Sequence, residues 1–124
     1  KLIQVPMVID FIIASSYAKT ESRGVVQIHA DLREDITGKN VLLIEDIVDT
    51  GLSLKYIKEM LLKRNPASLK TCVLLDKKSR RAADVPLDYV GFEIPNEYVV
   101  GYGLDYENRF RNLPYISIFK KAVK

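Results

Sequence analysis

Apolar and polar positions along the chain predict strands, turns and one helix around a central stretch, residues 41–54. Its first four residues, Val41 to Ile44, are apolar, and Glu45 and Asp46 follow directly. A short continuous apolar run that ends in turn signals is typical of a strand buried on both faces. Two more apolar residues precede Asp49-Thr50-Gly51, after which the pattern becomes helical. The stretch therefore predicts a buried strand, an acidic turn and a helix start.

The predicted helix runs from Gly51 to about Arg64, with Asp49 and Thr50 as its candidate N-caps. Apolar and charged residues occupy opposite faces of this helix. The inward face carries Leu54, Ile57 and Leu61, and the outward face carries Lys55, Lys58 and Glu59. Asn65-Pro66 then ends the helix.

Further strands are predicted on both sides of this unit. Residues 7–14 and 25–30 favour two strands that pair as a long hairpin, and the polar residues 15–24 between them favour a long surface loop. Downstream strands are predicted at residues 68–75, 87–94 and 115–119. This order predicts an α/β fold with a mostly parallel, twisted sheet, flanking helices and a ligand site at the carboxyl ends of the strands.

Composition is consistent with one globular domain. The 124 residues are 48% hydrophobic and 28% charged, enough to bury a core without disulfides. The single Cys72 excludes an internal disulfide, and no signal peptide or membrane-length apolar run is found, so we expect a cytoplasmic protein. The net charge of +3 is mildly basic, and the basic residues are not interleaved with aromatic ones. An RNA-binding domain therefore has only charge in its favour, and anionic small molecules fit equally well.

The residue types at the central turn suggest a sugar phosphate and a divalent metal. Glu45 and Asp46 offer carboxylate oxygens that suit hydroxyl groups or Mg²⁺. Gly51 lets the backbone approach a ligand, and a helix N-terminus attracts phosphate. The alternative is an ordinary strand–turn–helix corner, in which the acids are solvated and Asp49 is only a helix cap. For a generic corner of this kind, that alternative would be favoured.

The complete string is more specific. EDIVDTG, residues 45–51, resembles the phosphoribosyl-pyrophosphate motif of the type I phosphoribosyltransferases. Residues 90–115 resemble the C-terminal part of the hypoxanthine–guanine phosphoribosyltransferases, and residues 74–81 resemble the purine-reading lysine segment of that family. Ser15-Ser16-Tyr17 resembles the start of the family's flexible catalytic loop. The resemblance covers nearly the whole chain and implies one phosphoribosyltransferase domain with a Rossmann-like fold.

This resemblance implies an enzyme of purine salvage that transfers 5-phosphoribosyl from phosphoribosyl pyrophosphate to hypoxanthine or guanine. The products are IMP or GMP and pyrophosphate, and the cofactor is Mg²⁺. It implies that Asp49 is the general base near purine N7, and that Glu45 and Asp46 bind the ribose hydroxyls with Mg²⁺ nearby. The implied 5′-phosphate cradle consists of Thr50, Gly51, Leu52 and Ser53.

The second half of the chain has its own implied roles. Lys77 would donate to purine O6, Tyr98 would stack on the base and the Val99 backbone would bind the base edge. Asp105 would coordinate Mg²⁺ held by pyrophosphate, and Arg111 would bind pyrophosphate oxygens. Without the resemblance, these residues fit a solvated basic surface, aromatic packing, a helix cap and a surface charge. His29 is expected to be a surface residue, and residues 15–24 to close over the site during turnover.

The resemblance also leaves two matters open. Members of the family carry an upstream segment with a pyrophosphate-binding Gly-Gly loop, and residues 1–124 contain no Gly-Gly. We expect either a fragment of a longer enzyme or a reduced protein with an altered donor site. A regulatory module that senses phosphoribosyl pyrophosphate or a nucleotide is the alternative function. Contacts with nucleic acid or membrane are not expected, and a homo-oligomer, dimer or tetramer, is.

Overall fold

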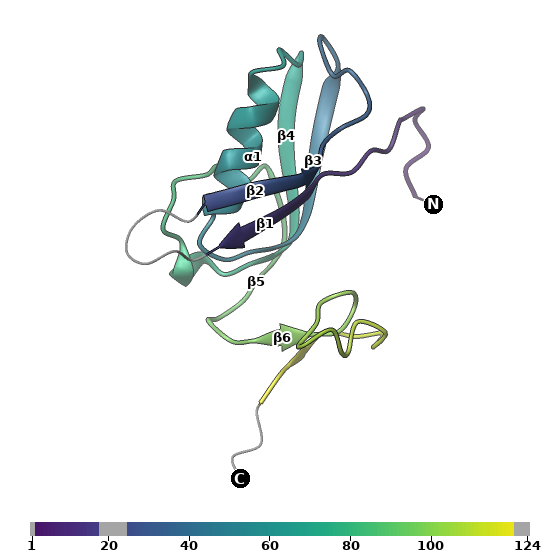
Figure 1. The fold of residues 1–124 in the computed structure, drawn as a ribbon. Coiled ribbons are helices and arrows are strands. Elements are labelled where there is room, and N and C mark those ends of the chain that lie inside the picture. Colours follow the sequence, from purple (N-terminus) through teal and green to yellow (C-terminus); the bar gives the residue numbers. More distant parts are fainter. Residues whose placement is uncertain (1, 18–24, 121–124) are drawn as a thin grey trace.

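A computed structural model describes residues 2–17 and 25–120, which form three small sheets, one α-helix and one 3-10 helix (Figure 1). In chain order the elements are β1 (Ile13–Tyr17), β2 (Val25–Ala30), β3 (Asn40–Val48), α1 (Leu52–Leu62), β4 (Ser68–Asp76), the 3-10 helix η1 (Lys78–Arg80), β5 (Tyr89–Glu93), β6 (Val99–Val100) and β7 (Ser117–Ile118). Across these two described ranges, no helix is long and apolar enough to cross a membrane.

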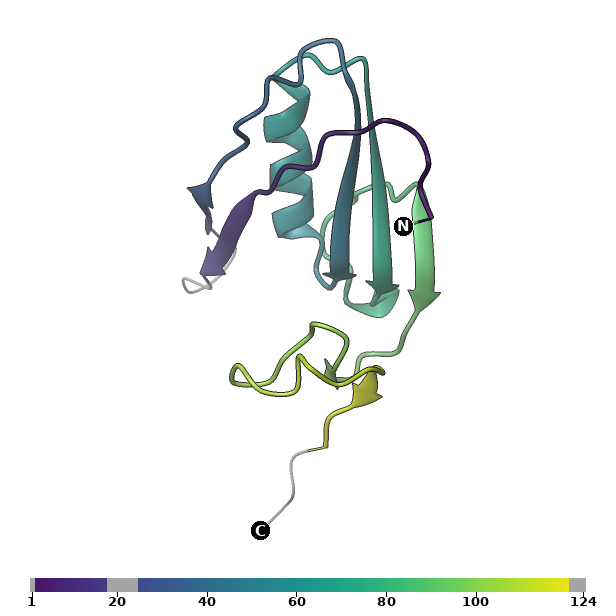
Figure 2. The ribbon, with the colours of Figure 1, turned by 90° about the vertical axis from the view of Figure 1, so that its right-hand side faces the viewer.

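The main sheet is parallel and has the strand order β3-β4-β5. All three strands point the same way, and α1 makes the crossover between β3 and β4 (Figure 2). Ile44 pairs with Cys72, which in turn pairs with Tyr89. The predicted α/β class and parallel sheet are confirmed, as is the parallel crossover after the central strand.

The core lies between the sheet and α1. Leu54, Ile57 and Leu61 are the buried residues of α1, as the helical pattern predicts. Leu54 packs with Val48 and Val73. Ile57 and Leu61 pack with Ile36, and partly buried apolar side chains of the β1–β2 hairpin pack against this second cluster. The hairpin is antiparallel, as predicted, and lies on the same side of the sheet as α1 (Figure 2).

The other face of β3 is open, so the prediction of a strand buried on both faces is wrong. Burial alternates along β3, and the side chains of Leu42 and Ile44 are 46% and 66% exposed. β3 is an edge strand, and α1, the single α-helix among the described residues, covers one face only. A continuous apolar run indicates side chains that favour burial on both faces of a strand, but it cannot show whether a segment of the protein covers each face.

Three predicted boundaries also need correction. The first strand begins at Ile13 rather than at residue 7, and Ser15, Ser16 and Tyr17 belong to β1 rather than to a loop. β3 continues to Val48, because its ladder with β4 extends beyond the acidic pair, so Glu45 and Asp46 lie in a strand and not in a turn. The remainder of the predicted loop, residues 18–24, lies outside the described residues.

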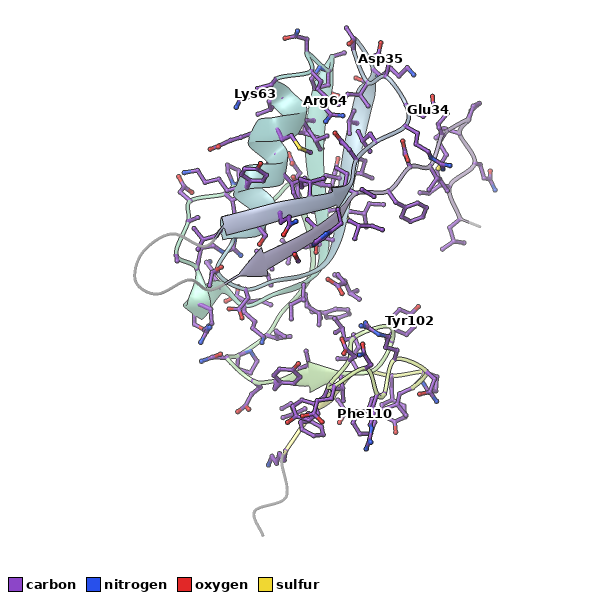
Figure 3. All side chains as sticks on the ribbon, viewed as in Figure 1. Glu34, Asp35, Lys63, Arg64, Tyr102 and Phe110 are labelled. Carbon is purple, nitrogen blue, oxygen red and sulfur yellow. The ribbon has the colours of Figure 1, made fainter. Side chains whose placement is uncertain are left out.

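The C-terminal part sits below the carboxyl ends of the parallel strands (Figure 2). It contains the antiparallel pair β6–β7 and an aromatic cluster in which Tyr98 meets Tyr106 and Phe119. Figure 3 shows Tyr102 and Phe110 in this part, at the opposite end of the molecule from Lys63 and Arg64. Charged and aromatic residues of the second half of the chain therefore gather near the sheet edge where a ligand site was predicted.

Candidate functional site

A cleft of about 430 Å³ opens where the carboxyl end of β3 meets the start of α1 and the β1 strand. This volume falls within the range of small-molecule sites, roughly 300–1,000 Å³. Five of the residues predicted for substrate binding or catalysis line it, together with Ser16 from the hairpin: Glu45, Asp49, Thr50, Gly51 and Ser53. The central motif and one residue of the predicted catalytic loop therefore face the same space.

Gly51 shapes the start of α1. It is the N-cap residue, with φ 81°, and as a glycine it caps the helix without a side chain. The prediction that Asp49 or Thr50 is the N-cap is therefore wrong. The left-handed conformation favours glycine. The Thr50 carbonyl instead accepts hydrogen bonds from the amides of Ala82 and Ala83, at 2.9 and 3.0 Å. The first N–H groups of a helix have no intrahelical partner, so this turn can bind an anion through its backbone.

The side chains beside this turn are placed differently from one another. Ser53 lines the cleft and is partly buried. Leu52 is exposed, and its amide lies 3.5 Å from Thr50 Oγ1, at the limit of a hydrogen bond. Leu52 can therefore contribute a backbone N–H to an anion site, while Ser53 can contribute a hydroxyl as well.

Glu45 and Asp46 are close enough to influence each other. Burial, the charge of Asp46 and a hydrogen bond between the two side chains together raise the pKa of Glu45 to about 7, and burial is the largest of these causes. Asp46 is exposed, and its Oδ1 accepts a hydrogen bond of 2.7 Å from the Ile47 amide. A cation or a hydroxyl donor placed between them would relieve the repulsion between the two carboxylates.

Asp49 faces the cleft and has a cationic partner. Its Oδ1 accepts a hydrogen bond of 2.9 Å from Nε of Arg80, which extends from η1 in the β4–β5 loop. Both side chains are about half exposed, at 43% for Asp49 and 47% for Arg80. A carboxylate held at one oxygen beside a small-molecule cleft is suited to accept a proton from a bound ligand.

Lys77 is buried, although its basic neighbours in η1 are exposed. Its side chain and backbone together are only 8% exposed, and its amide donates to the Val48 carbonyl at 2.9 Å. Its Nζ lies 6.0 Å from the centre of the Tyr98 ring. The interpretation of Lys77 as part of a solvated basic surface is therefore wrong for this residue, because its neighbours cover all but 8% of its surface.

A second cluster surrounds Tyr98. The Tyr98 hydroxyl donates to the Asp105 carbonyl at 3.1 Å, and Val99 is partly buried in β6. The Asp105 carboxylate pairs with Arg111 at 2.9 Å and also accepts from the Asn108 amide at 2.8 Å. The structure thus brings Tyr98, Asp105 and Arg111 together, and none of the three lines the main cleft.

Ser15 and Ser16, for which the sequence predicts a loop, contact different parts of the molecule. Ser16 lines the cleft, whereas Ser15 Oγ lies 2.6 Å from Nε2 of His29, which is exposed as expected. Tyr17 ends β1. Closure of residues 15–24 stays a prediction.

Two arginines next to the site were not singled out by the sequence. Arg80 contacts Asp49, and Arg81 forms an ion pair with Asp76 in which both side chains are largely buried. Both lie in the basic segment KKSRR, residues 77–81, which ordinarily indicates a solvated surface. The sequence therefore did not distinguish them from their exposed neighbours. The one available signal was the acidic motif itself, which leaves several carboxylates at a strand end in need of cations.

The sequence is similar to those of known proteins. A family model for the phosphoribosyl transferase domain matches residues 1–107. The chain is 54% identical to the hypoxanthine phosphoribosyltransferase of Salmonella typhimurium, over 93% of the chain and 65% of that protein. It is 50% identical to the hypoxanthine-guanine-xanthine phosphoribosyltransferase of Tritrichomonas foetus, over 92% of the chain and 63% of that protein.

The fold is likewise similar to solved structures. A hypoxanthine phosphoribosyltransferase from Staphylococcus aureus superposes with a TM-score of 0.89 at 52% identity. The match covers 94% of the chain and 64% of that structure. The chain therefore spans slightly less than two thirds of the length of these similar proteins.

Proposed function

This chain belongs to the phosphoribosyl transferase domain family, and we propose that it acts in purine salvage as a hypoxanthine–guanine phosphoribosyltransferase. The observation that carries the proposal is the cleft lined by Glu45, Asp49 and the N-terminus of α1, where Gly51 is the N-cap residue. The identity of about 50% to proteins named for this activity supports it. Orotate and adenine phosphoribosyltransferases share the acidic motif, but the purine-reading segment around Lys77 favours a 6-oxopurine.

The donor would bind at the start of α1. The backbone at Thr50, Gly51 and Leu52 and the hydroxyl of Ser53 would hold the 5′-phosphate, because helix N-termini and hydroxyl groups donate to anions. Glu45 and Asp46 would then accept hydrogen bonds from the ribose 2′- and 3′-hydroxyls. Such contacts would offset the burial and the repulsion by Asp46 that together raise the pKa of Glu45.

The residues present fit Mg²⁺ that is carried by the donor. Within the part of the chain that the structure describes, no three acidic, His or Cys side chains gather into a ready-made metal site. Mg²⁺ commonly binds one or two carboxylates and completes its shell with substrate oxygens and water. Glu45 and Asp46 would hold it near the ribose, and Asp105 would hold it near pyrophosphate. The ion would neutralise charge on the leaving group.

The purine would bind between Lys77 and Tyr98. Lys77 can only donate, so it matches the O6 acceptor of hypoxanthine and guanine and opposes the amino group of adenine. The exposed face of Tyr98 would stack on the base, and the Val99 backbone would bind its edge. Buried polar groups left unpaired by the wrong base give this kind of site its selectivity.

In the reaction, the bond from ribose C1 to pyrophosphate breaks and a bond from purine N9 to C1 forms with inversion. Asp49 would accept the proton from purine N7, a role that typically contributes about 10²–10⁴-fold. Arg111 would bind pyrophosphate oxygens with its planar guanidinium, exchanging its pairing with Asp105 for the ligand. Proton acceptance and leaving-group neutralisation then occur on opposite sides of the sugar.

The test is a coupled assay for nucleoside monophosphate formation with the complete natural chain. We expect IMP from hypoxanthine and GMP from guanine, dependent on phosphoribosyl pyrophosphate and Mg²⁺, and no AMP from adenine. Binding of phosphoribosyl pyrophosphate without turnover of any purine would reject the enzyme and favour the sensor.

A further inference from the structure

The β4–β5 loop contacts three consecutive residues, Val48 at the end of β3 and Asp49 and Thr50 in the turn to α1. The Lys77 amide donates to the Val48 carbonyl, and the amides of Ala82 and Ala83 donate to the Thr50 carbonyl. Between these backbone contacts, Arg80 reaches the carboxylate of Asp49. The loop therefore binds the residues on both sides of Asp49 through backbone hydrogen bonds and contacts the Asp49 side chain through Arg80.

The backbone of Arg80 is itself fixed. Its amide donates to the Lys77 carbonyl at 2.9 Å, within η1. The next residue, Arg81, is anchored by its buried ion pair with Asp76 and by close packing on Gly51, where an added Cβ would lie 2.9 Å from Arg81 Cδ. The guanidinium of Arg80 therefore extends toward Asp49 from a rigid base.

The charges around Asp49 make this contact the relevant one. Glu45 lines the same cleft as Asp49, and both it and its neighbour Asp46 are acidic. Lys77 follows β4 and has its Nζ 6.0 Å from the centre of the Tyr98 ring, and Arg81 is already paired with Asp76. Arg80 is the cation whose hydrogen bond reaches the Asp49 carboxylate directly. It occupies Oδ1 and thereby fixes the direction of the second oxygen, Oδ2.

We propose that Arg80 is a positioning residue, which orients the Asp49 carboxylate so that its second oxygen can accept the purine proton. This inference rests on the proposed function, since it assigns a partner to the proposed base. Arg80 acts through Asp49 and not on the substrate. Orientation of a base by a third group is a general feature of sites in which a side chain transfers a proton, and small misplacements of such groups reduce rates strongly.

The experiment is a double-mutant cycle in the complete natural chain, with hypoxanthine and phosphoribosyl pyrophosphate as substrates. Arg80→Gln should lower kcat about tenfold and leave both KM values within about twofold, because the misplaced base affects the transition state more than binding. Arg80→Lys keeps a cationic donor and should recover most of the loss. Lys78→Gln, an exposed residue of the same 3-10 helix, is the matched control and should leave kcat unchanged.

The decisive comparison adds Arg80→Gln to Asp49→Asn. If Arg80 acts through Asp49, the second substitution should change kcat by less than about twofold in this background, because residues that act as a unit are not additive. A further tenfold loss, or no loss in the single variant, would overturn the inference while the unmodified protein remained active. An unmodified protein that forms no nucleotide would instead reject the proposed function.

Discussion

The Nζ atom of Lys77 lies 6.0 Å from the centre of the Tyr98 ring, which places a buried cation and an exposed aromatic face at the same end of the parallel sheet. The two residues are separated by 21 positions and by the whole of β5. Hydrogen bonding of the Lys77 amide to Val48 fixes the lysine next to the β3–α1 turn. This hydrogen bond therefore fixes the proposed purine site relative to the proposed donor site, which follows the end of β3.

Lys77→Ala is expected to weaken purine use selectively. Losing a hydrogen bond to a charged group should raise KM for hypoxanthine and guanine about 10- to 100-fold. KM for phosphoribosyl pyrophosphate should change much less, since the phosphate cradle lies at the start of α1. Steady-state kinetics with each substrate varied will measure both values, and Lys78→Ala in the exposed part of the same segment is the control. An equal rise in both KM values would contradict the assignment.

Asp49→Asn is expected to reduce kcat by about 10²-fold or more, because the amide cannot accept the N7 proton. Binding of phosphoribosyl pyrophosphate should change little. The cap explanation makes the opposite prediction, and it is already weakened by the finding that Gly51, not Asp49, is the N-cap. Asp84→Asn, in the exposed β4–β5 loop, is the matched control for removing one carboxylate. Nearly unchanged turnover in the Asp49 variant would remove the base from the mechanism.

Glu45 is expected to make the protein less stable as the pH rises from about 4.5 to about 7. Its pKa is raised to about 7 in the folded protein, so over this range the folded state binds more protons than the unfolded state. Glu45→Gln should therefore stabilise the protein above pH 7, by at most about 3 kcal/mol, and should have little effect below pH 4.5. Thermal or urea unfolding at pH 4.5 and pH 8 will measure the difference.

The control for this measurement is Glu59→Gln on the exposed side of α1. A stabilisation at pH 8 that is equal in both variants would show that net charge, and not the buried position of Glu45, is responsible. The same measurement with added Mg²⁺ and phosphoribosyl pyrophosphate should reduce the advantage of Glu45→Gln, because ligands that need the carboxylate stabilise the unmodified protein preferentially.

The sequence predicted the helix and the strands more accurately than it predicted which segments pack against them. The helix stripe of Leu54, Ile57 and Leu61 was correct because one helix packs on one face of a sheet. The exposure of Ile44 could not be predicted, since an apolar run does not reveal what covers it. Residues 7–12 are apolar apart from Asp10, yet they belong to no strand among the described residues, because a ladder needs a partner strand as well as a suitable sequence.

The site shows the same division. The segment from Glu45 to Ser53 is contiguous in sequence, so its chemistry could be inferred from the residues and its family resemblance. The burial of Lys77 and the contact between Arg80 and Asp49 depend on where the β4–β5 loop folds back, over 31 residues in the second case. Long-range contacts of this kind have no local sequence signal, and a run of basic residues conceals which of them is buried.

Gly51→Ala is expected to damage the phosphate cradle, and Gly38→Ala is its matched control. Both glycines have left-handed backbones, with φ of 81° and 68°. An added Cβ at Gly51 would lie 2.9 Å from Arg81 Cδ and 2.9 Å from Val85 Cγ1, whereas at Gly38 it would meet no atom of the described residues within 4 Å. Each substitution carries the backbone cost of about 1–2 kcal/mol, and only the one at Gly51 adds a steric clash.

We therefore expect Gly38→Ala to lower the free energy of unfolding by about 1–2 kcal/mol without changing KM for phosphoribosyl pyrophosphate. Gly51→Ala should lower it further and raise that KM, because the β4–β5 loop or the turn must shift to make room for the methyl group. Urea unfolding and steady-state kinetics on the two variants separate backbone strain from site distortion. Equal losses of stability with equal KM values would show that the packing of Arg81 and Val85 on Gly51 does not shape the donor site.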